Sequence, residues 1–283
     1  MQSDPQTRLD PSEEWADILI MTGLHEELIG LQRVFGSECH RLARYGTSYL
    51  VYEWRRSSRH VRIVALRQQE KGLTSSAVTA TKALCIWRPK LAVMTGICAG
   101  VKAAVNLGDL VVASQCFEHS SGQLRDGELI PEQNRVSTPP WVLDFLMAHT
   151  DSQELQDQIR IGFGQSLPSD LMPTVHYGAM ACGPQVIKDQ SYIESLKSKE
   201  HSLLAIDMES YGIALAASMC STYVRPIVPL IVKGVCDFAD SEKTDAWHDY
   251  CSYASAAFLH AVLDRAISRE RAYNWIKDIA NDD

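Results

Sequence analysis

Long apolar runs and paired cysteines are absent from this sequence. No stretch approaches the ~18 consecutive apolar residues of a membrane-spanning helix. The first fifteen residues, MQSDPQTRLDPSEEW, are polar and acidic, unlike a secretion signal. The eight cysteines include no CxxC pair, and several lie within apolar runs. We therefore expect a soluble, cytoplasmic protein with no membrane contact and with reduced, mostly buried thiols.

Positive charge is scarce as well. The 283 residues include 27 Lys and Arg against 35 Asp and Glu, a net charge of −8, and the isoelectric point is near 5.6. No basic stripe marks a surface for nucleic acid, so we expect no nucleic-acid partner. A small anionic molecule is still compatible with this charge, because a few local cations can hold one.

Several catalytic and cofactor motifs are also missing. The chain has no GxxxxGK[ST] phosphate loop and no GxSxG nucleophile elbow. Its nine histidines form no HExxH motif, and the stretch GICAG is not the GxGxxG of a dinucleotide site. We expect neither a bound metal ion nor a cofactor.

The chain does contain a regular alternation of apolar strands and amphipathic helices. Buried-strand patterns cover residues 16–23, 60–68, 91–96, 109–117 and 228–237. Helical spacing of apolar residues covers 25–36, 73–87, 141–150, 207–220 and 247–267.

This order predicts an α/β fold in a single domain, with a mostly parallel, twisted central sheet and helices on both of its faces. Residues 1–14 are expected to form a flexible tail, and residues 15–283 the domain itself. The polar stretch 118–140 predicts a long loop, and the helix over 73–87 is expected to be capped near Thr74.

Carboxylates stand near the ends of several of these elements. Glu26 and Glu27 follow the first strand, and Asp237 ends the last. Glu209 is expected one turn inside a helix that Asp207 would cap. Taken singly, each has a plain structural explanation, as a partner for a helix dipole or as a turn residue. Together they stand at the carboxyl ends of parallel strands, where ligands of open α/β sheets bind.

Four stretches of the chain carry a family resemblance. They are, in order, ILIMTGLHEEL, MTGICAGVKAAVNLGDLVVA, AIDMESYGIALAA and IVKGVCDFAD. Together they resemble the nucleoside phosphorylase superfamily, and most nearly its hydrolytic branch, similar to methylthioadenosine/S-adenosylhomocysteine nucleosidases. The resemblance extends from about residue 16 to residue 266. It implies an enzyme of that fold that hydrolyses an N-glycosidic bond.

The resemblance also implies roles for the carboxylates. Glu27 would orient and deprotonate the attacking water, and Asp237 would give a proton to N7 of the purine. Met208 and Glu209 would pack against the ribose and hold its hydroxyls. Breaking the bond leaves an oxocarbenium-like sugar and an anionic base, so the chemistry needs both an acid and a water-activating carboxylate. Cys236 occupies the place of the serine that usually precedes the acid.

The base would be bound by backbone groups, by small or apolar side chains and by one aromatic lid. In the family the turn corresponding to TGICAG runs along the ribose and purine, where bulky side chains would collide with the ligand. The residues that the resemblance assigns to the base site are Ile97, Cys98, Ala99, Ala181, Cys182, Cys236 and Trp247.

Hydrolysis is favoured over phosphorolysis. Met94 and Thr95 stand where phosphorylases of the superfamily have a phosphate-binding arginine. Glu26 and Glu27 would also repel a phosphate beside them.

Three cationic residues are candidates for binding the 5′ group of the substrate. Lys71 precedes a glycine and a helix N-terminus, which suit an anion, and Arg67 and Arg125 are the other candidates. They are either solvated surface charges or the site of a 5′-phosphate. In the second case the chain resembles superfamily members that remove adenine from ATP or AMP, some of which serve as effectors in bacterial antiviral systems.

The expected function is therefore hydrolysis of an adenine nucleotide or nucleoside with release of adenine, with ATP or AMP favoured. A methylthioadenosine/S-adenosylhomocysteine nucleosidase is the alternative. A purine nucleoside phosphorylase and a non-catalytic nucleoside-binding module are further alternatives, and the intact set of Glu27, Glu209 and Asp237 argues against the last. The resemblance also implies a homo-oligomer, a dimer or larger.

Overall fold

The computed structural model describes residues 14–56, 58–125, 128–131, 134–150, 152–165, 167–168, 171–240 and 245–277. Nearly all of the expected tail, residues 1–13, lies outside the described residues.

The strands of the described chain are β1 (Ile18–Thr22), β2 (His40–Arg44), β3 (Thr47–Arg56), β4 (Arg59–Arg67), β5 (Leu91–Gly100), β6 (Leu110–Glu118), β7 (Gly122–Arg125), β8 (Glu128–Pro131), β9 (Arg135–Ser137), β10 (Val175–Cys182), β11 (Leu203–Asp207) and β12 (Val228–Asp237). The helices are α1 (His25–Phe35), α2 (Leu73–Trp87), α3 (Pro140–Thr150), α4 (Gln153–Gly162), α5 (Gln190–Lys199), α6 (Ser210–Cys220), α7 (His248–Ser268) and α8 (Glu270–Lys277). Within the described residues, none of these helices is both long and apolar enough to cross a membrane.

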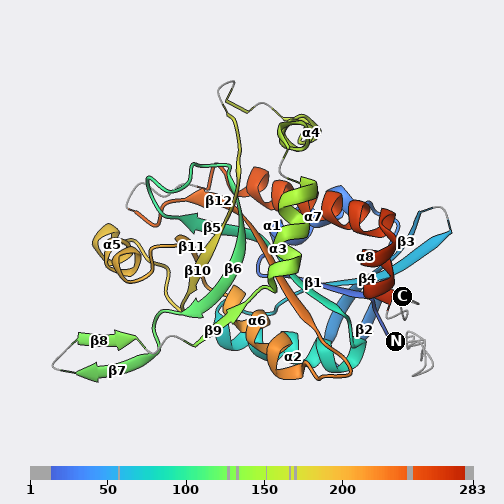
Figure 1. Cartoon of the computed structure of the whole chain (residues 1–283), viewed down its shortest axis with the longest axis horizontal. Helices are drawn as coiled ribbons and strands as arrows, with labels where there is room; N and C mark the ends of the chain where they lie inside the picture. Colours follow the sequence, from blue (N-terminus) through green and yellow to red (C-terminus); the bar gives the residue numbers. More distant parts are fainter. Residues whose placement is uncertain are drawn as a thin grey trace, which may run out of the picture.

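Two sets of parallel strands form the centre of the ten-stranded sheet, and β2, β3 and β9 join it by antiparallel pairing (Figure 1). One set is β4, β1, β5 and β12, and the other is β6, β10 and β11. The two sets meet through antiparallel pairings of β12 with β6 and of β11 with β5, which close five strands into a ring. The hairpin of β2 and β3 extends the sheet antiparallel to β4. The α/β class expected from the sequence is confirmed, with more antiparallel pairing than expected, both between the two parallel sets and at the β2–β3 edge.

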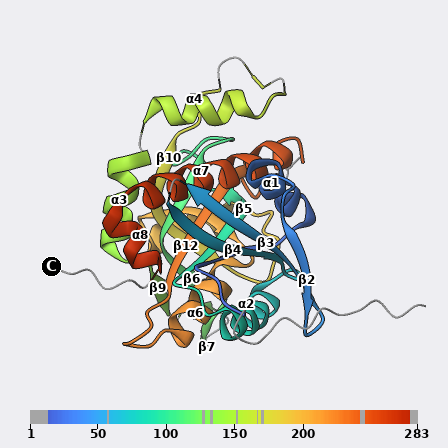
Figure 2. The ribbon, with the colours of Figure 1, turned by 90° about the vertical axis from the view of Figure 1, so that its right-hand side faces the viewer.

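The central strands are apolar throughout because both of their faces are covered. Ile18 and Ile20 of β1 pack in one core with α1, α3, α4, α7 and α8, whereas Leu19 and Met21 pack in a second core with α2 and α6. Side chains alternate across a strand, so a strand between two helical layers buries every residue. Figure 2 shows α1 and α7 on one side of the sheet and α2 and α6 on the other.

Most of the elements predicted from the sequence are present within two residues of their expected bounds: β1, β4, β6, β12, α1, α2, α3 and α7. The strand predicted over 91–96 is longer, because its second half pairs with β12 and β11 and continues to Gly100. The stretch predicted as a loop, 118–140, contains β7, β8 and β9.

Two of the predicted helices, α2 and α6, have a different N-cap residue in the structure from the one expected. Gly72, not Thr74, is the N-cap of α2. The helix expected over 207–220 begins at Ser210, because residues up to Asp207 pair with β10 as a strand. Glu209 is therefore the N-cap of α6 rather than a residue one turn inside it.

The close approach of α1 to α7 provides a test of the packing. A methyl group on Gly30 would lie 2.7 Å from the backbone carbonyl of Ser252 in α7 and 2.9 Å from the Tyr253 nitrogen. We expect Gly30→Ala to lower the free energy of unfolding by about 1–3 kcal/mol in urea denaturation, because a helix backbone cannot move aside as a side chain can.

Gly162→Ala is the matched control for this prediction. Its new methyl would meet the hydroxyl end of Tyr253, 2.5 Å away, and this side chain can rotate. Both substitutions gain helix propensity of up to about 1 kcal/mol. Equal stability of the two variants would contradict a rigid contact between α1 and α7.

Candidate active site

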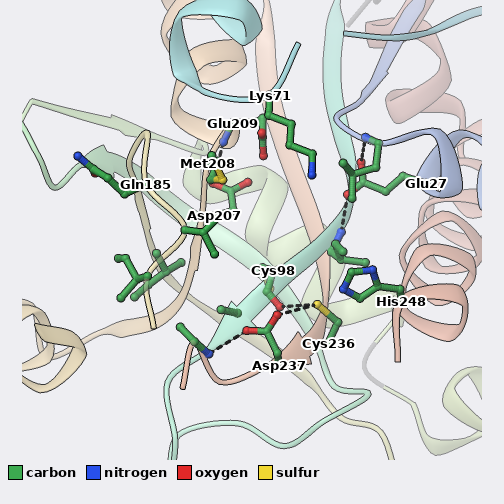
Figure 3. A pocket seen from close by; sticks show the side chains of 17 residues that line it. Glu27, Lys71, Cys98, Gln185, Asp207, Met208, Glu209, Cys236, Asp237 and His248 are labelled. Atoms are coloured by element: carbon green, nitrogen blue, oxygen red, sulfur yellow. Dashed lines mark hydrogen bonds between the residues drawn. The ribbon is translucent and has the colours of Figure 1, made fainter. Parts of the chain in front are cut away.

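The ends of β1, β11 and β12, the second half of β5 and the starts of α2 and α7 surround one cavity (Figure 3). Its volume of about 140 Å³ is roughly ten times the ~10–15 Å³ that a single water requires. The cavity can therefore admit part of a small organic molecule. Figure 3 shows Asp207, Glu209 and Lys71 toward one end of it and Asp237 with Cys236 toward the other.

Glu27 is buried in this cavity and is held by three backbone N–H groups. Its Oε2 accepts hydrogen bonds from Gly23 at 2.6 Å and Leu24 at 2.8 Å, and its Oε1 accepts one from Ile97 at 2.8 Å. A carboxylate offers about four lone-pair sites, so about one is left for a ligand or a water. These contacts place Glu27 between the end of β1 and the middle of β5.

Gly96 explains how the carboxylate comes so close to β5. Its φ is +148°, and a Cβ atom at this position would lie 1.9 Å from Oε1 of Glu27. The glycine in the MTGICAGV stretch thus makes room for a protein carboxylate. The residues that follow it, Ile97, Cys98 and Ala99, line the cavity as the resemblance implied.

A buried lysine stands beside this carboxylate. Lys233 of β12 is 1% exposed, and its Nζ lies 3.4 Å from Oδ2 of Asp207 and 3.9 Å from Oε1 of Glu27. Burial lowers the pKa of Lys233, but Glu27, Asp207 and Glu209 together outweigh it and leave that pKa above its ordinary value. Lys233 is therefore the cationic centre of a group of three carboxylates.

Asp207 and Glu209 occupy the junction between β11 and α6. Asp207 accepts hydrogen bonds from the Ser210 backbone N–H at 3.1 Å and from the Ser210 hydroxyl, so its side chain holds the first residue of α6, although Glu209 rather than Asp207 is the N-cap. Oε1 of Glu209 accepts a hydrogen bond from Gly72 at 2.9 Å. Burial and the nearby Asp207 raise the pKa of Glu209. Met208, between the two acids, also lines the cavity.

Asp237 lies at the end of β12 beside a β-bulge. The register of β12 against β5 shifts by one residue between Val235 and Asp237, so Cys236 has no partner in the ladder. Both Cys236 and Asp237 consequently line the cavity. Oδ1 of Asp237 accepts a hydrogen bond from Ala239 at 2.8 Å, and the Cys236 thiol donates to Oδ2 at 3.4 Å.

Among the described residues that line the cavity, Lys71 is the only lysine or arginine. Its side chain is exposed, and it directly precedes Gly72 at the start of α2. The other two predicted 5′-group cations are not at the wall: Arg67 is exposed at the end of β4, and Arg125 is exposed at the end of β7.

Three predicted base-site residues also lie outside the cavity. Ala181 and Cys182 are fully buried in β10, and the Cys182 sulfur accepts the N–H of Tyr211 at 3.2 Å. Trp247 borders a separate hollow with Leu171. The chain leaves the sheet only after Cys182, and the residues that reach the cavity are the next few, Gln185, Val186 and Ile187.

The sequence reasoning missed two more residues of the site. His248, the first residue of α7, lines the cavity, whereas its neighbour Trp247 does not. Lys233 had a signal in the sequence, because a single charge inside the apolar run VPLIVKGVCD must be compensated by partners. His248 had no such signal in the sequence, because a single histidine at the start of a helix does not by itself indicate a binding site.

Comparison with known proteins identifies the family of this chain. The family model described as "Phosphorylase superfamily" matches residues 17–268, and the chain belongs to that superfamily. The resemblance inferred from the four sequence stretches is thereby confirmed.

The individual relatives share less than a third of their aligned residues with this chain. The chain is 27% identical over 267 residues to ATP nucleosidase Cap17 of Escherichia coli, covering 86% of this chain and 52% of that protein. It is 22% identical over 205 residues to the 5′-methylthioadenosine/S-adenosylhomocysteine nucleosidase of Haemophilus influenzae, covering 71% and 81%. Its fold matches futalosine hydrolase of Helicobacter pylori with a TM-score of 0.67 and 19% identity, covering 88% and 97%. The chain spans about half the length of the first curated relatives it matches.

The buried lysine generates a stability prediction. Lys233→Met should lower the free energy of unfolding by about 3–5 kcal/mol near neutral pH, because it leaves buried carboxylates without their counter-charge. The loss should shrink on acidification. The carboxyl pKa values of the folded variant would be raised, so its folded state binds protons more readily than its unfolded state does. Urea denaturation at about pH 7 and about pH 5 measures both effects.

Lys102→Met is the matched control, since Lys102 pairs with Asp240 at 3.2 Å and is 54% exposed. Its removal should change the free energy of unfolding by at most about 1 kcal/mol. A Lys233→Met variant as stable as this control at both pH values would contradict the central position of Lys233.

Proposed function

We propose that this protein hydrolyses the N-glycosidic bond of an adenine nucleotide or nucleoside and releases adenine. The observation that carries the proposal is that Glu27 and Asp237 line one cavity with Met208 and Glu209. An N-glycosidase needs an acid for the leaving base and a carboxylate for the attacking water. Membership of the phosphorylase superfamily and the names of the two nucleosidase relatives support adenine as the base.

In the proposed mechanism the C1′–N9 bond breaks as the base leaves. Asp237 gives its proton to N7 of the adenine, so that the base departs neutral. Water held by the remaining lone pair of Glu27 attacks C1′, and its proton passes to Glu27. Glu209 holds the ribose hydroxyls, Met208 packs on the sugar, and the Ile97–Ala99 segment of β5 lies along the nucleoside. The positive charge of Lys233 offsets the negative charges of Glu27, Asp207 and Glu209.

Hydrolysis is favoured over phosphorolysis on two observations. Met94 takes the place that the resemblance assigns to the phosphate-binding arginine of phosphorylases. It is fully buried and packs in the core with α2 and α6. A phosphate in the place of the attacking water would face Glu27, whose oxygens already accept three backbone hydrogen bonds. Like charges at such short range disfavour each other.

The 5′ group is proposed to be a phosphate. Lys71 lies at the wall of the cavity and is exposed to solvent, which suits a charged group that extends outward. The relative named as an ATP nucleosidase supports the same choice. We further propose that the protein acts in the cytoplasm as a homo-oligomer and that removal of adenine from nucleotides serves antiviral defence.

The acid and the base are tested together. Asp237→Asn should lower adenine release about 10²–10⁴-fold, because an amide cannot donate the proton. Glu27→Gln should lower mainly kcat, since water activation is felt in the transition state. The assay incubates protein with ATP, AMP, adenosine or methylthioadenosine in phosphate-free buffer and measures adenine by chromatography.

Glu26→Gln is the control for Glu27→Gln, because it makes the same change at an exposed neighbouring residue. Circular dichroism and thermal unfolding confirm that each variant is folded. Normal adenine release by a folded Asp237→Asn variant would remove Asp237 from the mechanism, and release that depends on added phosphate would refute the proposed hydrolysis.

Lys71→Ala tests the 5′-phosphate. A charge-assisted hydrogen bond contributes roughly 1.5–3 kcal/mol, so kcat/KM for ATP or AMP should fall about ten- to a hundredfold. Adenosine should be affected little, because it has no group for Lys71 to hold. Lys199→Ala, at an exposed position at the end of α5, is the control. A wild-type preference for methylthioadenosine over every nucleotide would instead establish a thioether nucleosidase.

A further inference from the structure

Within the part of the chain that the structure describes, three potential metal ligands converge at one end of the cavity. Cys236 and Asp237 come from the end of β12, and His248 comes from the start of α7. Their sulfur, oxygen and nitrogen atoms all lie within 4.8 Å of one another. Figure 3 shows the imidazole of His248 beside the thiol of Cys236. The two residues from β12 are buried, and His248 is mostly buried.

The distances between these atoms suit a small ion after slight side-chain rotation. Tetrahedral zinc with bonds of about 2.0–2.3 Å separates its ligand atoms by about 3.5 Å. The Cys236 sulfur and the Asp237 oxygen are already 3.4 Å apart. The remaining separations, at most 4.8 Å, exceed the tetrahedral spacing by about 1.3 Å or less.

The histidine has the surroundings of a metal ligand. Its Nε2 is buried and makes no hydrogen bond, although Oδ1 of Asp245 lies 3.4 Å away. Its Nδ1 lies 3.4 Å from Oε2 of Glu26. Whichever ring nitrogen binds a metal, the other has a carboxylate within reach to orient the ring, as metal-binding histidines require.

The chemistry of the donors selects the kind of ion. A thiolate and an imidazole prefer zinc and other soft or borderline transition ions, whereas magnesium and calcium require mainly oxygen ligands. Three protein ligands leave a fourth position open to solvent or to substrate. On binding, the Cys236 thiol loses its proton to solvent, so the bond from sulfur to hydrogen is replaced by one from sulfur to metal.

We propose that Cys236, Asp237 and His248 form an inhibitory site for Zn²⁺ at one end of the nucleoside cavity. A zinc ion there occupies a carboxylate oxygen of Asp237 and fills space that the base would enter. Binding itself follows from the geometry of the three ligands. Inhibition rests on the proposed function, because it requires Asp237 to be the acid.

Direct binding is measured first, with Co²⁺ as a spectroscopic substitute for Zn²⁺. Wild-type protein should develop a thiolate-to-cobalt charge-transfer band in the near ultraviolet, and added Zn²⁺ should abolish it. Cys236→Ser should lose the band, and His248→Gln should weaken cobalt binding about 10–100-fold. Binding should strengthen with rising pH as the thiol proton is released more readily. Cys85→Ser is the matched control, because Cys85 is an exposed thiol outside the cavity.

Inhibition is measured in a second arm with chelator-buffered Zn²⁺. Adenine release by wild-type and Cys85→Ser protein should fall at the same zinc concentration, and His248→Gln should need at least about tenfold more zinc. Absence of a charge-transfer band in wild-type protein, its persistence in Cys236→Ser or its loss in Cys85→Ser would overturn the site. If Cys236→Ser does not fold, an unchanged cobalt affinity of His248→Gln overturns it instead. Failure of wild-type protein to release adenine would refute the proposed function while the cobalt band still decides the metal site.

Discussion

The candidate site depends on one buried cation. Lys233 stands in the middle of β12, and the three carboxylates that raise its pKa come from α1, from the end of β11 and from the N-cap of α6. Ionised groups in a protein interior are tolerated only when they are paired. The lysine therefore makes it possible to bring Glu27, Asp207 and Glu209 together in the fold, and these acids in turn reach the cavity wall.

The backbone of β5 and β12 completes the arrangement. Gly96 lets the Glu27 carboxylate approach β5 to a distance that any side chain would block, and the N–H of Ile97 holds it there. On the neighbouring strand, the bulge at Cys236 directs two consecutive residues into the cavity, which a regular strand would send to opposite faces. The positions of Glu27 and Asp237 thus follow from local irregularities in an otherwise regular sheet.

Two different chemistries are proposed at the same end of the cavity. Asp237 is the proposed proton donor to the leaving base, and with Cys236 and His248 it also forms a cluster of potential zinc ligands. The two uses exclude each other, because a carboxylate oxygen bound to a metal is not available to carry a proton. Because Cys236 adjoins the proposed acid Asp237, the proposed catalytic site is also the proposed site of inhibition by metal ions.

The amino-acid sequence by itself determined the α/β class, the superfamily and the long apolar strands and helices, because continuous apolar runs and helical spacing are local patterns, which β1, β12 and α7 carry. Short or mixed elements such as β2, β10 and α5 escaped prediction, since their patterns depend on which neighbours cover them. The carboxylates of the cavity could also be chosen from their places at strand and helix ends. Only the tertiary structure decided that His248 rather than Trp247 lines the cavity, that Val186 rather than Ala181 does so, and that Lys233 pairs with the acids. These facts depend on contacts between residues far apart in the chain, which no local pattern encodes.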